Sequence, residues 1–284
     1  MSAAALHERA GQASARRNRI EQRFAELAGR GRKALIPFVT AGDPSLDATV
    51  PVLHALVDAG ADVLEIGMPF SDPMADGPVI QRSSERALAR GASLTYVLEC
   101  VKQFRRRDAE TPIVLMGYLN PVEIFGIDAF AAQAAQAGVD GVLLVDLPPE
   151  EAHETRAVLA RQGIAMIVLA APTTDATRLA QLTATASGYL YYVSFAGVTG
   201  AAGLDADIVG ARLRQVRAAC PVPVVAGFGI RDAVGAAAVA AEADGVVVGS
   251  ALVAAIADAN APDDAASRAA AFLAPLRSAL DALR

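Results

Sequence analysis

The chain has 284 residues, a formal net charge of −6 and 54% hydrophobic residues, and it contains two cysteines. This length suits one large α/β domain, and apolar residues never run on for the roughly 18 positions that a membrane-spanning helix needs. The acidic balance and the aromatic content of 5% provide neither the basic surface nor the stacking platform that nucleic-acid-binding proteins use, so we expect no nucleic-acid and no membrane partner.

The first residues mix arginines with alanines, a pattern faintly similar to a transit peptide. Glu8 and Glu21 argue against that reading, because transit peptides are poor in acids. We therefore expect residues 1–18 to form a flexible N-terminal extension and residues 19–284 to form one domain, which begins with an additional helix near Arg19.

Short runs rich in β-branched residues alternate with helical stretches through the rest of the chain, which is typical of βαβ units on a parallel sheet. The expected strands are residues 34–39, 62–67, 113–117, 141–146, 165–170, 189–194, 222–226 and 245–249. Eight such units close most naturally as a (β/α)8 TIM barrel, and an open doubly wound sheet is the alternative.

The helix expected after the first strand has a local start signal. Asp43 is predicted as its N-cap and Pro44 as its first position, followed by Val50, Leu53 and Val57 at helical spacing.

A weak internal repeat supports the same architecture. Its copies are AGADVLEIG, AGVDGVLLVD and AEADGVVVGS. Each reads as a helix end, a turn with Asp62, Asp140 or Asp244, and then a buried strand.

Glu65 occupies a strand position at which the other two copies have Leu143 and Val247. Strand parity turns it opposite to Leu64 and Ile66, towards the barrel axis and near the end where barrel active sites lie. Burial there would raise its pKa towards the range of a general acid or base at neutral pH. The alternative is a glutamate that only satisfies neighbouring backbone or hydroxyl groups.

The loop that follows, residues 68–78, is long for a βα connection and carries Asp72 and Asp76. Either aspartate alone is typical of a turn or cap. Beside Glu65 at the mouth of a barrel, one of them becomes a second candidate for proton transfer or hydrogen bonding.

Glycines at the ends of the last two strands indicate a phosphate site. Gly229 follows the seventh strand, and Gly249 with Ser250 follows the eighth and opens a helix. Barrels commonly bind phosphate in these loops, through backbone N–H groups and a helix N-terminus. Because Arg231 is the one cation in either loop, binding is expected to rest on backbone groups, although glycines also mark tight turns.

The segment after the sixth strand, residues 194–203, is rich in glycine and small residues. This composition suits a lid that excludes water, with Thr199 able to anchor it to an acid on the second loop. An ordinary flexible loop has the same composition.

Histidine, cysteine and lysine point away from several chemistries. His7, His54 and His153 all fall away from strand ends, and no metal-ligand spacing occurs, so no metal is expected. Cys100 and Cys220 are expected to be reduced thiols in a cytoplasm. No lysine stands at a strand end, which disfavours a Schiff base.

Six motifs occur in order, and together they resemble the tryptophan synthase alpha chain family. They are LIPFVTAGDPS, LEIGMPFSDPMADGP, GVDGVLLVDLPPEE, YYVSFAGVTG, VAGFGI and DGVVVGSALV. The resemblance runs from about residue 19 to residue 257. It implies a lyase that cleaves indole-3-glycerol phosphate reversibly, by a retro-aldol reaction, to indole and glyceraldehyde 3-phosphate in L-tryptophan biosynthesis.

The resemblance also implies roles for individual residues. Glu65 matches the acid/base that moves protons at the indole ring carbon and the glycerol hydroxyl. Asp76 matches the carboxylate that hydrogen-bonds the indole N–H and stabilises developing positive charge. The implied substrate-pocket residues are Phe38, Tyr191, Thr199 and Phe228, and Thr199 is the lid residue that reaches Asp76 on closure. The implied phosphate contacts are Gly200, Gly229, Gly249 and Ser250.

In the family, the alpha chain needs no cofactor of its own and pairs with a beta chain that contains pyridoxal phosphate, in an alpha2beta2 heterotetramer. Asp72 and Pro73 are implied to face that partner. The sequence departs from the family at Phe195, where many members have an arginine after the serine of the lid.

Two other functions fit parts of the pattern. Another phosphate-binding barrel, such as a sugar-phosphate epimerase or the isomerase of the same pathway, would need a different acid/base set. A regulatory or scaffolding subunit would not need to keep its carboxylates, whereas Glu65 and Asp76 are both present.

Overall fold

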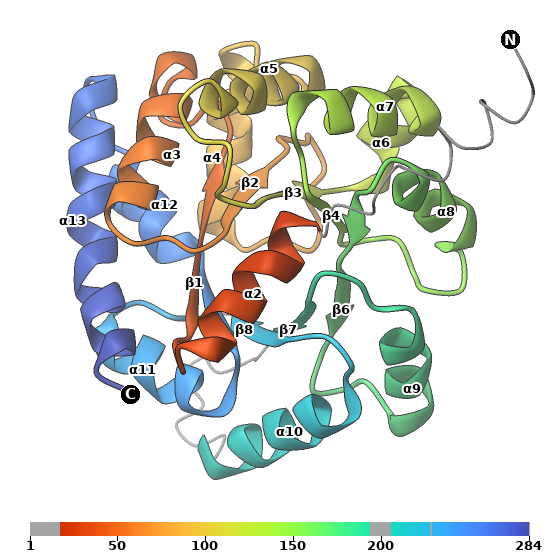
Figure 1. The fold of residues 1–284 in the computed structure, drawn as a ribbon. Helices are drawn as coiled ribbons and strands as arrows, with labels where there is room; N and C mark the ends of the chain where they lie inside the picture. The colour runs from red at the N-terminus through yellow and green to blue at the C-terminus, as the bar shows by residue number, and fades with distance from the viewer. Residues whose placement is uncertain (1–17, 194–205, 228, 284) are drawn as a thin grey trace, which may run out of the picture.

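The computed structural model describes residues 18–193, 206–227 and 229–283, and within them parallel strands form one curved sheet (Figure 1). The strands are β1 (Ala34–Thr40), β2 (Leu64–Gly67), β3 (Ile113–Gly117), β4 (Gly141–Leu144), β5 (Ala165–Met166), β6 (Val168–Ala170), β7 (Leu190–Val193), β8 (Val224–Gly227) and β9 (Gly245–Val248). Their order in the sheet is β5-β4-β3-β2-β1-β9-β8-β7-β6. The prediction of a TIM barrel is confirmed.

The fifth expected strand, residues 165–170, is split into β5 and β6. The N–H of Ile167 donates to the carbonyl of Val142 on β4 at 2.9 Å, whereas the next residue, Val168, pairs with Leu190 on β7. This strand therefore changes its neighbour at Ile167. Because both edges of the sheet belong to the same strand, the sheet closes on itself there.

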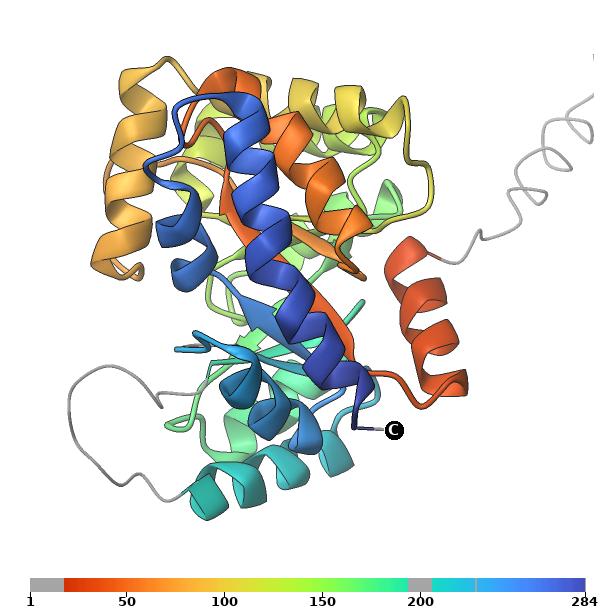
Figure 2. The same cartoon turned by 90° about the vertical axis from the view of Figure 1, so that its left-hand side faces the viewer.

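The described helices surround the barrel, all on its outside except the first, which lies across one end (Figures 1 and 2). They are α2 (Arg19–Gly29), α3 (Thr49–Asp58), α4 (Pro78–Ala89), α5 (Leu94–Arg105), α6 (Leu119–Phe125), α7 (Ile127–Ala137), α8 (His153–Arg161), α9 (Ala176–Thr185), α10 (Ala206–Ala219), α11 (Ala233–Glu242), α12 (Ser250–Ile256) and α13 (Pro262–Asp281), with a 3-10 turn, η1 (Leu46–Ala48). Helix α13 packs against α3, α11 and α12. Among the described residues, no helix combines the length and apolarity needed to cross a bilayer.

Helix α2, the additional N-terminal helix, lies across the end of the barrel at which the strands begin (Figure 1). Its apolar face, Ile20, Phe24 and Leu27, is buried in the same cluster as the inward-facing strand residues. Asn18 caps the helix by accepting from the Ile20 N–H at 2.9 Å, and its side-chain amide donates to the carbonyl of Asp140 at 2.7 Å. The helix therefore seals this end of the barrel. The expected extension lies outside the described residues and stays a prediction.

The aspartates of the internal repeat lie at the same end of the barrel. Each accepts a backbone N–H from the start of a neighbouring strand, and the pairs are Leu35 with Asp62 at 2.9 Å, Ile113 with Asp140 at 2.9 Å and Val224 with Asp244 at 2.8 Å. Each also pairs with an arginine, namely Arg277, Arg105 and Arg217 respectively. The repeat therefore corresponds to one interaction, found three times, in which an aspartate paired with an arginine holds the starts of neighbouring strands together.

The helix after β1 begins later than its sequence signal indicates. A 3-10 turn with Ser45 at its N-cap comes first, and α3 begins at Thr49. The carboxylate of Asp43 instead accepts two hydrogen bonds from Arg86, at 2.7 and 2.8 Å. The prediction of Asp43 as N-cap was wrong, because a bidentate arginine satisfies the carboxylate more strongly than a helix N–H does.

Candidate active site

Glu65 lies on β2 and faces the interior of the barrel. It is opposite Phe38 of β1 on one side and opposite Val114 of β3 on the other. Its side chain is fully buried, and neither carboxyl oxygen has a hydrogen-bond partner among the described residues. Buried polar atoms are almost always hydrogen-bonded in proteins, so these two oxygens are exceptions. Both are available to a ligand.

The interior of the barrel changes the ionisation of Glu65. Burial raises the pKa of its carboxyl group from 4.5 to about 8, and the negative charge of Asp76 adds to that shift. The group is therefore protonated at neutral pH and has a pKa close to the value at which one residue can both give and take a proton.

Asp76 lies in the loop between β2 and α4 and is half-buried. Its backbone is fixed on both sides, because its N–H donates to the carbonyl of Pro73 at 3.0 Å and its carbonyl accepts from the Gln81 amide at 2.8 Å. Burial raises the pKa of the carboxyl group, and a hydrogen bond from Tyr118 opposes that shift.

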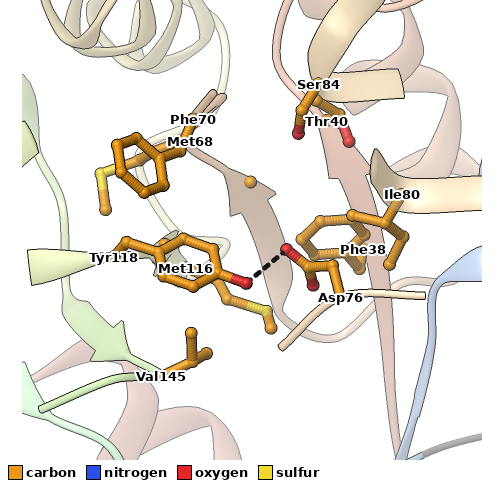
Figure 3. A pocket seen from close by; sticks show the side chains of 12 residues that line it. Phe38, Thr40, Met68, Phe70, Asp76, Ile80, Ser84, Met116, Tyr118 and Val145 are labelled. Atoms are coloured by element: carbon orange, nitrogen blue, oxygen red, sulfur yellow. Dashed lines mark hydrogen bonds between the residues drawn. The ribbon is translucent and has the colours of Figure 1, made fainter. Parts of the chain in front are cut away.

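Tyr118 was missed in the sequence, although it contacts Asp76 directly. It is the N-cap residue of α6, immediately after β3, and its hydroxyl donates to Asp76 Oδ2 at 3.0 Å (Figure 3). Its ring packs against Phe70, with 5.2 Å between the centroids. The available signal was its place, directly after a strand whose C-terminal end lies beside that of β2.

Phe38 forms one wall of the site, and two glycines leave room for its ring. A Cβ at Gly67 would stand 2.5 Å from Phe38 Cζ, and a Cβ at Gly249 would stand 3.4 Å from Phe38 Cδ1. Gly67 is the next inward position after Glu65 on β2. The ring of Phe38 therefore lies between the strand that carries Glu65 and the loop that precedes α12.

Tyr191 lies on β7, across the barrel from β2, and its side chain also faces the interior. Its hydroxyl lies against the backbone of Gly227. Burial raises the pKa of this hydroxyl well above its ordinary value, and the charges of Glu65 and Asp76 add to the shift. Tyr191 therefore stays a neutral hydroxyl across the neutral pH range.

A pocket opens between β1, β2, β3, β4 and α4 at the C-terminal ends of the strands (Figure 3). Its lining residues are Phe38, Thr40, Gly67, Met68, Phe70, Asp76, Ile80, Ser84, Met116, Gly117, Tyr118 and Val145. The pocket thus brings Phe38 and Asp76 together, from positions far apart in the sequence. Its walls combine apolar side chains with the polar groups of Thr40, Ser84, Asp76 and Tyr118.

Three of the four expected phosphate residues come shortly after the ends of the adjacent strands β8 and β9. Gly229 comes shortly after β8 and has a φ of 74°, a conformation that favours glycine. Gly249 follows β9 and is the N-cap residue of α12, and Ser250 is the first residue of that helix. The N–H groups in the first turn of a helix have no partner within the helix.

Three expected site residues, Thr199, Gly200 and Phe228, lie outside the described residues, as does Phe195. Their proposed roles stay predictions.

Asp72 and Pro73 lie in the same loop as Asp76 but do not line the pocket. Asp72 is exposed, and its carboxylate accepts from the Ser71 hydroxyl at 2.5 Å. The neighbouring Met74 is 83% exposed. These residues belong to the outer surface of the loop.

Potential metal ligands do not converge in the described part of the chain, since no three His, Cys, Asp or Glu side chains there form a group that could hold an ion. The titratable groups with shifted pKa values in this part of the barrel are Glu65, Asp76 and the two tyrosines, Tyr118 and Tyr191.

Comparisons with known proteins agree on one family. The family model described as tryptophan synthase alpha chain matches residues 24–281. A tryptophan synthase alpha chain from Xanthomonas euvesicatoria pv. vesicatoria is 69% identical over 264 residues, which cover 93% of this chain and 98% of that protein. One from Xylella fastidiosa is 67% identical and covers 94% of this chain and 100% of that protein.

Solved structures show the same similarity. The alpha subunit of tryptophan synthase from Legionella pneumophila superposes with a TM-score of 0.87 at 47% identity, over 93% of this chain and 99% of that one. A chain of the tryptophan synthase a2b2 complex from Pyrococcus furiosus superposes with a TM-score of 0.79 at 39% identity, over 86% of this chain and 98% of that one. Because the family model matches most of the chain and these relatives are similar over nearly their whole length, the chain belongs to the tryptophan synthase alpha chain family.

Proposed function

We propose that Glu65 and Asp76 carry out in this chain the reaction of its family, the reversible retro-aldol cleavage of indole-3-glycerol phosphate to indole and glyceraldehyde 3-phosphate. Membership of the family makes the chain a lyase of tryptophan biosynthesis. The observation that supports the residue assignment is the buried, unpartnered carboxyl group of Glu65 beside the pocket that holds Asp76.

Glu65 has the properties that the reaction asks of a single acid/base. Indole leaves as a carbon leaving group, so its ring carbon must be protonated before the carbon–carbon bond breaks. The hydroxyl of the departing aldehyde must then lose its proton. A carboxyl group that is protonated at neutral pH can donate the first proton and accept the second as the carboxylate.

Asp76 has the complementary role in this proposal. Protonation of the ring carbon places positive charge on the indole, and that charge reaches the ring nitrogen. A carboxylate at the pocket wall stabilises this charge and accepts a hydrogen bond from the ring N–H. Half-burial strengthens that interaction, because the local dielectric constant is lower than in water.

The phosphate of the substrate is proposed to bind at Gly229, Gly249 and Ser250. The short distance between Gly249 and the Phe38 ring supports this assignment, because a phosphate bound at Gly249 would adjoin the aromatic wall. Backbone N–H groups at the start of α12 would provide the donors. The substrate would then extend from the phosphate site, over Phe38, to Asp76.

We propose that the chain uses no cofactor of its own, because the steps above are proton transfers that carboxyl groups can perform. Pyridoxal phosphate would belong to the beta chain. The free thiols of Cys100 and Cys220 fit the reducing cytoplasm in which we place the chain.

A tryptophan synthase beta chain is the partner that the family and the a2b2 complex indicate. We propose that Asp72 and Pro73 contact it. An open groove beside this loop supports that surface, since it is lined by Pro69, Phe70 and the apolar face around Ile124. Ile124, which lines the groove, and Met74, which lies in the loop, are 84% and 83% exposed and would be available to a partner.

The test is indole release from indole-3-glycerol phosphate by the purified chain, alone and with a beta chain added. We expect slow release alone and a large increase with the partner. Absence of release under both conditions would contradict the substrate assignment.

A further inference from the structure

The hydroxyl of Tyr118 makes two hydrogen bonds inside the candidate site. It donates to Asp76 Oδ2 at 3.0 Å, and it accepts from the backbone N–H of Ala75 at 3.0 Å. The side chain is 3% exposed, and its position is fixed by its place at the junction of β3 and α6. One hydroxyl therefore connects the end of a strand to the loop that carries Asp76.

The direction of the hydroxyl proton follows from these two bonds. The N–H of Ala75 can only donate, so the hydroxyl oxygen must be the acceptor in that bond. Its single proton is then free to point to Asp76, and Asp76 Oδ2 must accept it. The network thus requires a lone pair on Oδ2 and directs the second oxygen, Oδ1, to other partners.

We propose that Tyr118 is a positioning residue for the cleavage reaction: it holds Oδ2 of Asp76 and so orients Oδ1 towards the substrate. This inference rests on the function proposed for Asp76. Tyr118 itself moves no proton to or from the substrate.

Among the described residues, Tyr118 is the side chain that hydrogen-bonds the Asp76 carboxylate. In the part of the chain that the structure describes, no lysine or arginine forms an ion pair with Asp76, and the hydrogen bond from Tyr118 is the one interaction that lowers the pKa of its carboxyl group. The titratable groups that act on the site from other elements are Glu65 on β2 and Tyr191 on β7, both of which respond to the charge of Asp76. Neither supplies positive charge.

Tyr118 is well held for this role. Its ring packs against Phe70 of the same loop. The next residue, Leu119, donates its N–H to the carboxylate of Asp146 at 2.8 Å, which fixes the start of α6 to the end of β4. Burial, together with the charges of Asp76 and Asp146, raises the pKa of the tyrosine hydroxyl, so it remains a donor across the neutral range.

The test is Tyr118→Phe in the complex with the beta chain, with kcat and KM for indole-3-glycerol phosphate measured across pH. Loss of one hydrogen bond to a charged group predicts a fall in kcat/KM of about 10- to 100-fold. Most of the fall is expected in kcat, because the charge on the indole develops in the transition state. The acidic limb of the pH profile is expected to move to higher pH, since Asp76 loses the bond that favours its carboxylate.

Tyr96→Phe is the matched control. The Tyr96 hydroxyl also makes two hydrogen bonds, to the Leu46 carbonyl at 2.6 Å and to the Thr49 hydroxyl at 2.7 Å, but on the outer layer of the barrel. We expect this variant to keep the kcat and pH profile of the unchanged chain. Unchanged kinetics in Tyr118→Phe would overturn the proposal, and so would a loss with no shift of the acidic limb.

A carbon-13 NMR titration of the Asp76 carboxyl group separates this inference from the proposed function. The pKa of Asp76 should rise in Tyr118→Phe whether or not the chain cleaves the substrate. If the wild-type chain releases no indole, the proposed function is wrong. The titration still shows whether Tyr118 lowers the pKa of Asp76. An identical Asp76 titration in both proteins would refute the positioning role.

Discussion

Glu65 and Phe38 occupy directly paired positions on the neighbouring strands β2 and β1. Both side chains face the barrel interior, so the candidate proton donor and the aromatic wall of the pocket share one step of the β-ladder. The hydrogen bonds of the sheet fix their separation, and no loop movement is needed to bring them together. Catalytic groups on strands are held more exactly than groups on loops, which suits proton transfer to a ring carbon.

Glu65→Gln should abolish cleavage while substrate binding stays largely intact. The amide has nearly the same shape but cannot transfer a proton, and loss of a general acid/base typically costs about 100-fold to 10,000-fold in rate. Indole release would measure turnover, and calorimetry would measure binding of indole-3-glycerol phosphate. Near-normal turnover in this variant would remove Glu65 from the mechanism.

The same variant should change how stability depends on pH. The folded-state pKa of Glu65 is about 8, compared with 4.5 for the free group, so the folded state holds a proton that the unfolded state releases between these values. Across this window, ionisation favours the unfolded state, and the contribution of Glu65 to stability falls as pH rises. As pH rises through this window, the free energy of unfolding of Glu65→Gln should therefore rise relative to that of the wild-type chain, by at most about 1.4 kcal/mol per pH unit.

Urea unfolding of both proteins at several pH values between about 4.5 and 8 would measure this difference. A difference that stays constant with pH would show that the folded state does not raise the pKa of Glu65.

Gly67→Ala should damage the pocket. The added Cβ would stand 2.5 Å from Phe38 Cζ, so the ring must move. Small displacements near reacting atoms cost up to about 100-fold in rate, and overpacking costs about 1–3 kcal/mol of stability. Steady-state kinetics and thermal unfolding would measure the two effects. Gly29→Ala is the control, since nothing lies within 4 Å of the added atom there, and normal kinetics in Gly67→Ala would show that Phe38 tolerates displacement.

Asp140→Asn should reduce stability but not turnover. Asp140 is 4% exposed and accepts from the Ile113 N–H and from two arginines, Arg19 and Arg105. Loss of its charge leaves the largely buried guanidinium of Arg105 without its counter-charge, at a cost of up to about 3–5 kcal/mol in the free energy of unfolding. Because the site lies at the opposite end of the barrel, kcat/KM should be unchanged.

Asp128→Asn provides the comparison for that prediction. Its pair with Arg161 is 3.5 Å long, and both side chains are exposed. Such surface pairs contribute little, so this variant should unfold like the unchanged chain. Equal losses of unfolding free energy in Asp140→Asn and Asp128→Asn would show that the buried ion pairs of Asp140 stabilise the fold no more than a surface pair does.

Most of the barrel could be predicted from the sequence, because each unit contains an apolar, β-branched run and glycines at its turns. The change of partner at Ile167 could not, since strand pairing depends on the register of distant segments. Glu65 was recognisable because the repeat places Leu143 and Val247 at the same position. Tyr118 was not recognisable, because its role depends on a hydroxyl contact with a residue 42 positions away.

The change of partner at Ile167 divides the barrel into two arcs that share β1. Glu65, Asp76 and Tyr118 belong to the arc from β1 to β5, whereas Tyr191 and the proposed phosphate residues belong to the arc from β6 to β9. A substrate held by its ring in one arc and by its phosphate in the other would bridge the two arcs over β1, the strand that they share. Amide hydrogen exchange in the ladders that β1 forms with β2 and β9 should therefore slow when substrate binds.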